Sequence, residues 1–176
     1  GQLDYLTLEY LAELTMSILA LQKQKDPELG YAHDFLTVMD RLAPHLHEQP
    51  NLRIVTNAGG MNPLACARKI SEILSRHELR NQKIAIVTGD DLMPSLDRYL
   101  ETGHTLNHID HGEPMTSIRD RLVSANAYLG GRSIVEALKL GATIVITGRV
   151  ADASLTLGPL VHEFGWSWND TDSDRL

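Results

Sequence analysis

The chain has 176 residues, of which 43% are hydrophobic and 22% charged, and its formal net charge is −7. This composition is ordinary for a globular domain, and the acidic balance speaks against nucleic acid or an anionic membrane surface as the main partner. Its one cysteine, Cys66, cannot form an internal disulfide and fits a reducing cytoplasm. Because no apolar run of about 18 residues occurs, we expect no transmembrane helix and a cytoplasmic protein.

In the first half of the chain, short β-branched runs that predict strands alternate with segments whose apolar residues have helical spacing. Strands are predicted over residues 3–8 and 53–56, and helices over residues 10–24, 32–46 and 63–78. The first helix is predicted from apolar residues at intervals of three and four: Leu11, Leu14, Ile18 and Leu21. The third has Asn62 as its expected N-cap and Pro63 at its first position.

The second half continues the alternation. Strands are predicted over residues 83–88 and 143–147, and helices over residues 133–140 and 153–164. Residues 122–127 are a weaker strand candidate, with a helix as the alternative. Within the last helix, Pro159 is expected to break the helix or to delay its start, because proline lacks the amide hydrogen.

Strands that alternate with helices predict an α/β fold. We expect one domain over residues 1–176, built as three layers with a mainly parallel sheet of about five strands flanked by helices. The fold would be Rossmann-like but without a dinucleotide fingerprint, since no GxGxxG motif occurs. In such sheets, ligands bind beyond the carboxyl ends of the strands.

The residues that follow the predicted strands are therefore the candidate site. They are glycines, amides, acids and one arginine: Glu13, Asn57, Gly59, Gly60, Asn62, Asp90, Asp91, Asn126, Gly148, Arg149 and Asp152. Each also has a structural interpretation, because glycine, asparagine and aspartate are common in turns and helix caps. Five such corners on one edge of a sheet favour a ligand site over a set of unrelated turns.

Three corners suggest specific chemistry. Gly59 and Gly60 would let the backbone approach an anion at a helix N-terminus. Asp90 and Asp91 could bind a divalent cation, or one of them could act as a general base, although Asp91 could also cap the next helix. Arg149 could bind a carboxylate or phosphate through two parallel hydrogen bonds, or form a salt bridge with one of the nearby aspartates.

The histidines and the cysteine do not predict a further functional site. His104, His108 and His111 lie between glycines and a proline, so a solvated loop is expected there and no metal site is predicted. Cys66 is expected to face the core of the domain. No cofactor can be identified from the sequence.

Four segments resemble a known family: "DYLTLEYLAELTM" (4–16), "VTNAGGMNP" (55–63), "SANAYLGG" (124–131) and "VITGRVADASLTLGPLVHEFGW" (145–166). They are similar to the N-terminal domain of the acyclic terpene utilisation protein A family. Members of that family are longer, with a further strand before this region and more chain after it. The resemblance therefore implies that the chain is a piece of a longer protein, truncated at both ends.

The resemblance implies a role in the bacterial catabolism of branched and acyclic terpenoid acids, with a hydratase-like or lyase-like step on an acyl-CoA or carboxylate. Arg149 and the Gly59–Gly60 turn would hold the anion, while Asp90, Asp91 or Asp152 would transfer a proton. Asn57 and Asn126 would stabilise an enolate oxygen, and Glu13 and Asn62 are recurrent positions of the family.

Two alternatives remain open. One is a non-catalytic subunit or scaffold that partners an acyl-CoA carboxylase, which predicts a contiguous exposed apolar patch. The other is a metal-dependent hydrolase built on Asp90 and Asp91. A homo-oligomer is expected in each case.

Overall fold

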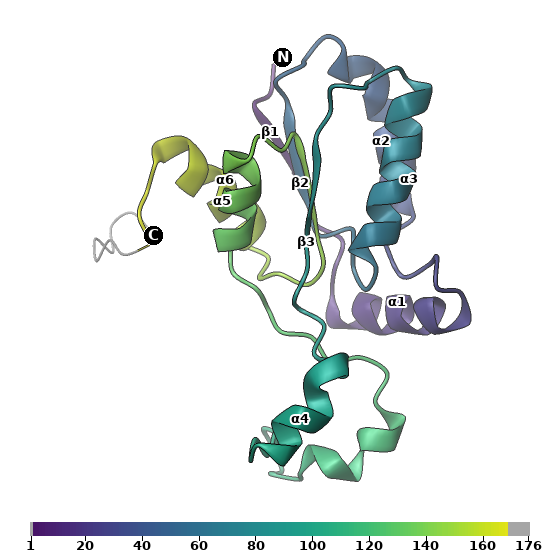
Figure 1. Cartoon of the computed structure of the whole chain (residues 1–176), viewed down its shortest axis with the longest axis vertical. Coiled ribbons are helices and arrows are strands. Elements are labelled where there is room, and N and C mark those ends of the chain that lie inside the picture. The colour runs from purple at the N-terminus through teal and green to yellow at the C-terminus, as the bar shows by residue number, and fades with distance from the viewer. Residues whose placement is uncertain (1, 169–176) are drawn as a thin grey trace.

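A parallel sheet lies between two layers of helices in the computed structural model of the protein, which describes residues 2–168 (Figure 1). Within that range the sheet has four strands: β1 (Tyr5–Leu8), β2 (Arg53–Thr56), β3 (Ile84–Val87) and β4 (Ile144–Thr147). Their order across the sheet is β1-β2-β4-β3, and all of them run in parallel. The prediction of an α/β fold with a parallel sheet is confirmed.

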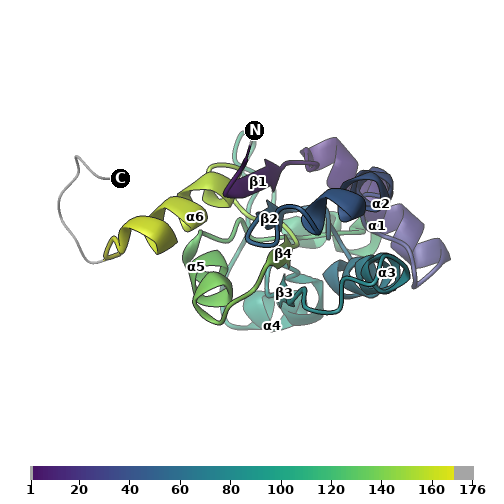
Figure 2. The same cartoon turned by 90° about the horizontal axis from the view of Figure 1, so that it is seen from above.

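Six α-helices accompany the sheet in the described part of the chain. They are α1 (Glu13–Lys25), α2 (Asp34–Leu46), α3 (Pro63–Arg76), α4 (Leu96–Glu101), α5 (Arg132–Lys139) and α6 (Ser154–Phe164). Helices α2 and α3 cover one face of the sheet, and α5 and α6 cover the other (Figure 2). Helix α1 lies crosswise beyond the carboxyl ends of the strands (Figure 1). None of the helices within residues 2–168 is long and apolar enough to cross a membrane.

The two central strands carry the core. Every residue of β4 is buried, and so are the last three residues of β2. On one face of the sheet, Ile54, Ile144 and Ile146 pack with α2 and α3, while Val55 and Val145 pack with α5 on the other. The continuous β-branched runs in the sequence follow from this burial on both faces.

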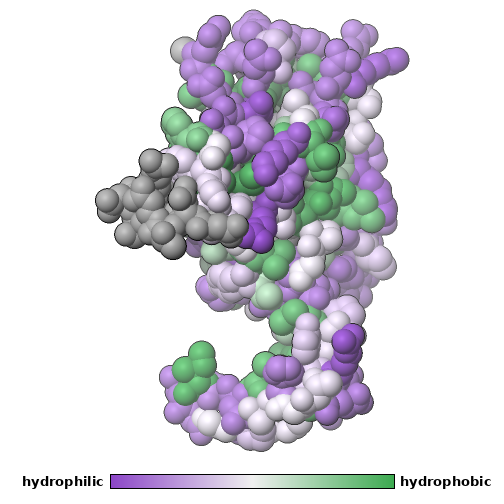
Figure 3. Space-filling view, turned by 60° about the vertical axis from the view of Figure 1, so that its left-hand side comes forward, coloured by the Kyte–Doolittle hydropathy of each residue, from purple (hydrophilic) through white to green (hydrophobic). Residues whose placement is uncertain are grey.

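The predicted strand over residues 122–127 is wrong, which reduces the sheet from about five strands to four within the described residues. This segment makes one isolated antiparallel bridge, between Asn126 and Asp91. It belongs to an excursion over residues 92–126 that projects beyond the carboxyl ends of the strands and contains one buried residue, Leu96. Figure 3 shows the excursion as a lobe below the main body, with a hollow between them.

The expected break at Pro159 is also wrong, because α6 runs through this proline. Gly158 and Pro159 are buried, and a Cβ atom on Gly158 would lie 2.7 Å from Ile134 Cγ2 of α5. Close packing of α5 on α6 therefore outweighs the single backbone hydrogen bond that a proline removes from a helix.

Helix α1 forms where its apolar periodicity predicts it, but most of that periodic stripe does not enter the core. Leu14, Ile18 and Leu21 are 73%, 48% and 47% exposed. The buried side of α1 instead consists of Met16, Leu19 and Ala20, which form a small cluster with Leu11 and Met61. Helix α1 is thus apolar on two sides, and one of them has no partner within the described residues.

Candidate functional site

The carboxyl ends of β2 and β4 mark a topological switch point. The chain leaves β2 toward α3 on one face of the sheet, and it leaves β4 toward α6 on the opposite face (Figure 2). Diverging connections of this kind open a crevice, where open α/β sheets bind ligands. The loops at residues 57–62 and 148–153 both start at this edge, so the fold brings the predicted corners together there.

Arg149 is buried at the end of β4, with 3% of its surface exposed. Its Nη1 donates a hydrogen bond to the carbonyl oxygen of Leu11 at 2.7 Å, and its Nη2 pairs with the carboxylate of Asp152. The guanidinium carbon lies 4.2 Å from the centre of the Tyr128 ring, a cation–π arrangement. Arg149 Nε has no hydrogen-bond partner among the described residues. The guanidinium is mostly occupied by the protein itself.

Asp90 supports the same corner from β3. Its buried carboxylate accepts hydrogen bonds from the Arg149 amide at 2.8 Å and from Asn126 Nδ2 at 2.9 Å, both through Oδ2. A Cβ atom on Gly148 would lie 2.5 Å from Asp90 Oδ1, which explains the glycine at that position. Asp90 thus holds the ends of β3 and β4 together.

Glu13 and Tyr128 close this corner on the solvent side, where the Tyr128 hydroxyl hydrogen-bonds to the Glu13 carboxylate. This hydrogen bond lowers the pKa of Glu13, and the acceptor carboxylate raises the pKa of Tyr128. Both side chains are exposed, so the pair links the start of α1 to the segment before α5 without forming part of the core.

Asn57 is fully buried at the end of β2. Its Oδ1 accepts from the Tyr10 amide at 2.8 Å, and its Nδ2 donates to Glu9 Oε1 at 3.0 Å. Glu9 Oε1 also accepts from the Leu11 amide at 2.7 Å. The side chain of Asn57 thereby fixes the chain between β1 and α1.

Close packing accounts for both glycines of the turn after β2. A Cβ atom on Gly59 would lie 2.6 Å from the Thr147 carbonyl oxygen, and one on Gly60 would lie 2.4 Å from a methyl group of Leu19. Gly60 also has a φ of +50°, a conformation that favours glycine. The amides of Gly60 and Met61 donate to Asn57 and Gly30 carbonyls, respectively. Two amides of the turn that was predicted to approach an anion are therefore already bonded within the protein.

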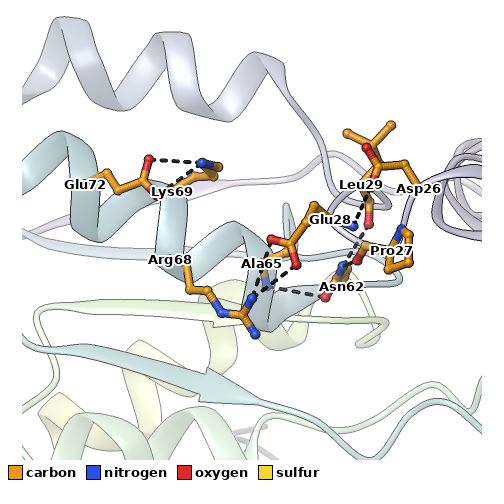
Figure 4. Close-up of polar contacts among 9 residues, drawn as sticks. All are labelled: Asp26, Pro27, Glu28, Leu29, Asn62, Ala65, Arg68, Lys69 and Glu72. Atoms are coloured by element: carbon orange, nitrogen blue, oxygen red, sulfur yellow. Dashed lines mark hydrogen bonds and ion pairs between the residues drawn. The ribbon is translucent and has the colours of Figure 1, made fainter.

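Asn62 caps α3, as expected, with Oδ1 accepting from the Ala65 amide at 3.3 Å. Its Nδ2 donates to the carbonyl oxygens of Pro27 and Leu29 at 2.7 and 2.8 Å. Figure 4 shows Asn62 between the first turn of α3 and the loop that follows α1. Every polar atom of this side chain holds the loop and the helix in place.

A cavity of about 250 Å³ lies beside this framework. It combines the C-terminal part of α1, the start of α3, the end of β3 and the end of the excursion. Its lining consists of Lys23, Gly60, Met61, Asn62, Pro63, Leu64, Thr88, Gly89, Asp90, Asp91 and Asn126. Five of the predicted residues meet here: Gly60, Asn62, Asp90, Asp91 and Asn126. Glu13, Asn57, Gly59, Gly148, Arg149 and Asp152 do not line it.

Lys23 is the cationic group of the cavity, and nothing in its sequence context singled it out. The segment Gln22–Lys25 has the composition of an exposed helix end. Lys23 is nevertheless partly buried, and its Nζ donates to the Met61 carbonyl oxygen at 2.7 Å. The crossing of α1 over the glycine turn places this lysine near the N-terminus of α3, where an anion is also stabilised by the helix dipole.

Asp91 is the exposed acid of the cavity. Its Oδ1 accepts from the Met93 amide at 3.0 Å, but Asp91 is not the helix cap of the alternative interpretation, because Leu92 is the N-cap of the short 3₁₀ helix Met93–Ser95. Asp91 Oδ2 has no hydrogen-bond partner among the described residues. Asp91 therefore differs from Asp90, whose carboxylate is buried and bonded. A bound molecule could exchange a proton with Asp91 without disturbing the framework.

A larger hollow of about 690 Å³ lies elsewhere, between β1 and α6, and contains none of the predicted residues. It is lined by Arg53, Tyr5 and Glu163, whose side chains bond to one another, and by apolar residues of α6. We regard the smaller cavity as the candidate site because it lies at the carboxyl edge of the sheet.

The described residues contain no group of three or more histidine, cysteine, aspartate or glutamate side chains that could hold a metal ion. His104, His108 and His111 are exposed in the projecting lobe, as expected for a solvated loop. Cys66, on α3, is buried in the core, and burial raises the pKa of its thiol to about 12.

The site thus has a cationic and dipolar side at Lys23 and α3 and an acidic side at Asp91, with Asn126 between the strands and the lobe.

No curated protein and no solved structure is significantly similar to the chain. The family described as "Acyclic terpene utilisation family protein AtuA" matches residues 1–175. The match spans every element that builds the site, so the chain belongs to the AtuA family, which is linked to acyclic terpene utilisation.

Proposed function

We propose that the protein is an enzyme of acyclic terpenoid acid catabolism that acts on a carboxylate or an acyl-CoA by hydration, dehydration or cleavage. The observation that carries this proposal is the cavity itself, where Lys23, the start of α3 and Asp91 face one space of about 250 Å³. That volume fits the reacting end of an acid or thioester, with the rest of a larger substrate extending outward.

In this proposal, Lys23 and the α3 dipole attract the carboxylate of the substrate or the oxygen of its enolate form. Asp91 removes the proton from the carbon next to the carbonyl group and can later return it. Asn126 contributes an amide hydrogen that its bond to Asp90 does not use. Asp90, Arg149, Asp152, Asn57 and Glu13 act as positioning residues, since their polar groups bond mainly within the protein.

Binding is tested by thermal unfolding of the full-length protein with branched acyl-CoAs and the corresponding free acids. A ligand at a hundred times its dissociation constant stabilises by about 2.7 kcal/mol, which raises Tm by several degrees. Lys23→Met should lose this shift. Lys25→Met is the matched control, because Lys25 is an exposed lysine of the same helix that does not line the cavity. A shift that survives in Lys23→Met would contradict the assigned anion site.

Proton transfer is tested by incubating protein and acyl-CoA in D₂O and measuring deuterium at the carbon next to the carbonyl by mass spectrometry. Deuterium should appear with the unmodified protein and be absent with Asp91→Asn, which should still show the thermal shift. Exchange at an undiminished rate in Asp91→Asn would assign the proton to another group.

A further inference from the structure

The exposed face of α1 has the pattern of an interface. Leu14, Ile18 and Leu21 recur at intervals of four and three, so they form one stripe along the helix. They are between 47% and 73% exposed, although the opposite side of α1 already packs against Met61 and Gly60. Scattered surface leucines are ordinary, whereas a contiguous apolar stripe on a helix marks a contact surface.

The stripe has the same order of side chains in both directions. From either end it reads leucine, isoleucine and leucine, with small Ser17 exposed beside Ile18 at its centre. A two-fold interface requires such self-complementarity, because each patch contacts its own reversed copy. An antiparallel pair centred between Ser17 and Ile18 places Leu14 of one copy against Leu21 of the other.

The two ends of α1 carry opposite charges, which favours the same antiparallel arrangement. The helix starts with Glu13 and ends with Lys25, and both side chains are exposed. Antiparallel pairing brings the acidic end of each copy within about one helical turn of the basic end of the other. A parallel pair would instead place like charges together at both ends, and its helix dipoles would repel.

We propose that α1 is the dimerisation helix of this protein and that a second copy of the chain covers its Leu14–Ile18–Leu21 stripe in antiparallel orientation. A helix of 13 residues is about 20 Å long. Paired helices of that length bury less than the roughly 800 Å² per partner of a standard interface, so the dimer is weak and depends on concentration. The inference concerns the outer side of α1 and does not depend on the chemistry of the cavity.

Single cysteine variants of the full-length protein test the arrangement. Ile18→Cys lies beside the two-fold axis and should form a disulfide-linked dimer under mild oxidation. Leu14→Cys should not link to itself, since its two copies lie about 10 Å apart along the axis, but it should link to Leu21→Cys when the two are mixed. The native Cys66 is fully buried, which removes it as a background reaction.

Leu140→Cys, at the residue that follows α5, is the control, because Leu140 is 75% exposed and lies outside the stripe. It should give no linked dimer. In light scattering, the unmodified protein should gain mass toward that of a dimer as its concentration rises, and Ile18→Lys should remain monomeric with an unchanged circular dichroism spectrum. A constant monomer mass without linkage of Ile18→Cys, or self-linkage of Leu14→Cys, would overturn the proposal.

Discussion

The two halves of the carboxyl edge use similar residues for different purposes. At the end of β4, Arg149 and Asp152 bond to each other, and Arg149 also bonds to Leu11. At the end of β3, Asp91 keeps a carboxylate oxygen free of partners within the described residues and faces the cavity with Lys23. The proposed ligand site therefore lies at the strand end where a carboxylate faces the cavity and keeps one oxygen unpaired.

The strongest test of this contrast is Arg149→Met. The variant removes the hydrogen bond to the buried Leu11 carbonyl and the cation–π contact with Tyr128. We expect the free energy of unfolding to fall by about 2–3 kcal/mol in urea denaturation. Arg41→Met, at an exposed position of α2, should change it by less than about 0.5 kcal/mol. If Arg149→Met impairs ligand binding at unchanged stability, Arg149 belongs to the site and the contrast fails.

Adjacent aspartates provide a smaller but closely matched test. Asp90→Asn weakens the two hydrogen bonds that Oδ2 accepts from Arg149 and Asn126, so stability should fall by about 1 kcal/mol. Asp91→Asn retains an oxygen for the Met93 amide and should cost less than about 0.5 kcal/mol. Equal losses in the two variants would show that both carboxylates serve the framework.

The smallest expected effect concerns Glu13 and depends on pH. Because the Tyr128 hydroxyl lowers the pKa of Glu13, the pair stabilises the fold above the ordinary pKa of a glutamate. That contribution is lost as the pH falls through the lowered pKa. Tyr128→Phe should raise the pKa of Glu13 toward its ordinary value in an NMR titration, and its stability should converge with that of the unmodified protein in acid. A Glu13 titration that is the same in both proteins would mean that the hydroxyl does not contact it in solution.

The sequence predicted most elements because local patterns determine them. β-Branched runs located β2, β3 and β4, and Asn62 with Pro63 located the start of α3. The strand over 122–127 was predicted wrongly because a few apolar residues there resemble a strand. A strand forms only where a neighbouring strand of the sheet can pair with it, and the local sequence does not show this.

The candidate site could be predicted in part. Strand ends converge by topology, which brings Asp90 and Asp91 to the cavity. Asn126 was assigned to a strand that does not form, and it reaches the cavity through its isolated bridge with Asp91. Lys23 was missed because it enters the cavity through the crossing of α1 over Gly60, a contact between residues far apart in the sequence. The salt bridge between Arg149 and Asp152 was one of the predicted alternatives, but the hydrogen bond of Arg149 to Leu11 was not predictable, since Leu11 lies 138 positions away.

The strand order also has a consequence for the synthesis of the protein. Strand β3 pairs with β4 and with no other strand in the described chain, and β4 lies between β3 and β2. Since β4 ends at Thr147 and β3 at Val87, the ribosome must add 60 further residues before β3 can pair. At common elongation rates this takes roughly 3–12 s, during which both edges of an apolar strand are open to other chains. The nascent chain is therefore most prone to aggregate in this interval, and chaperone binding should concentrate on residues 84–87.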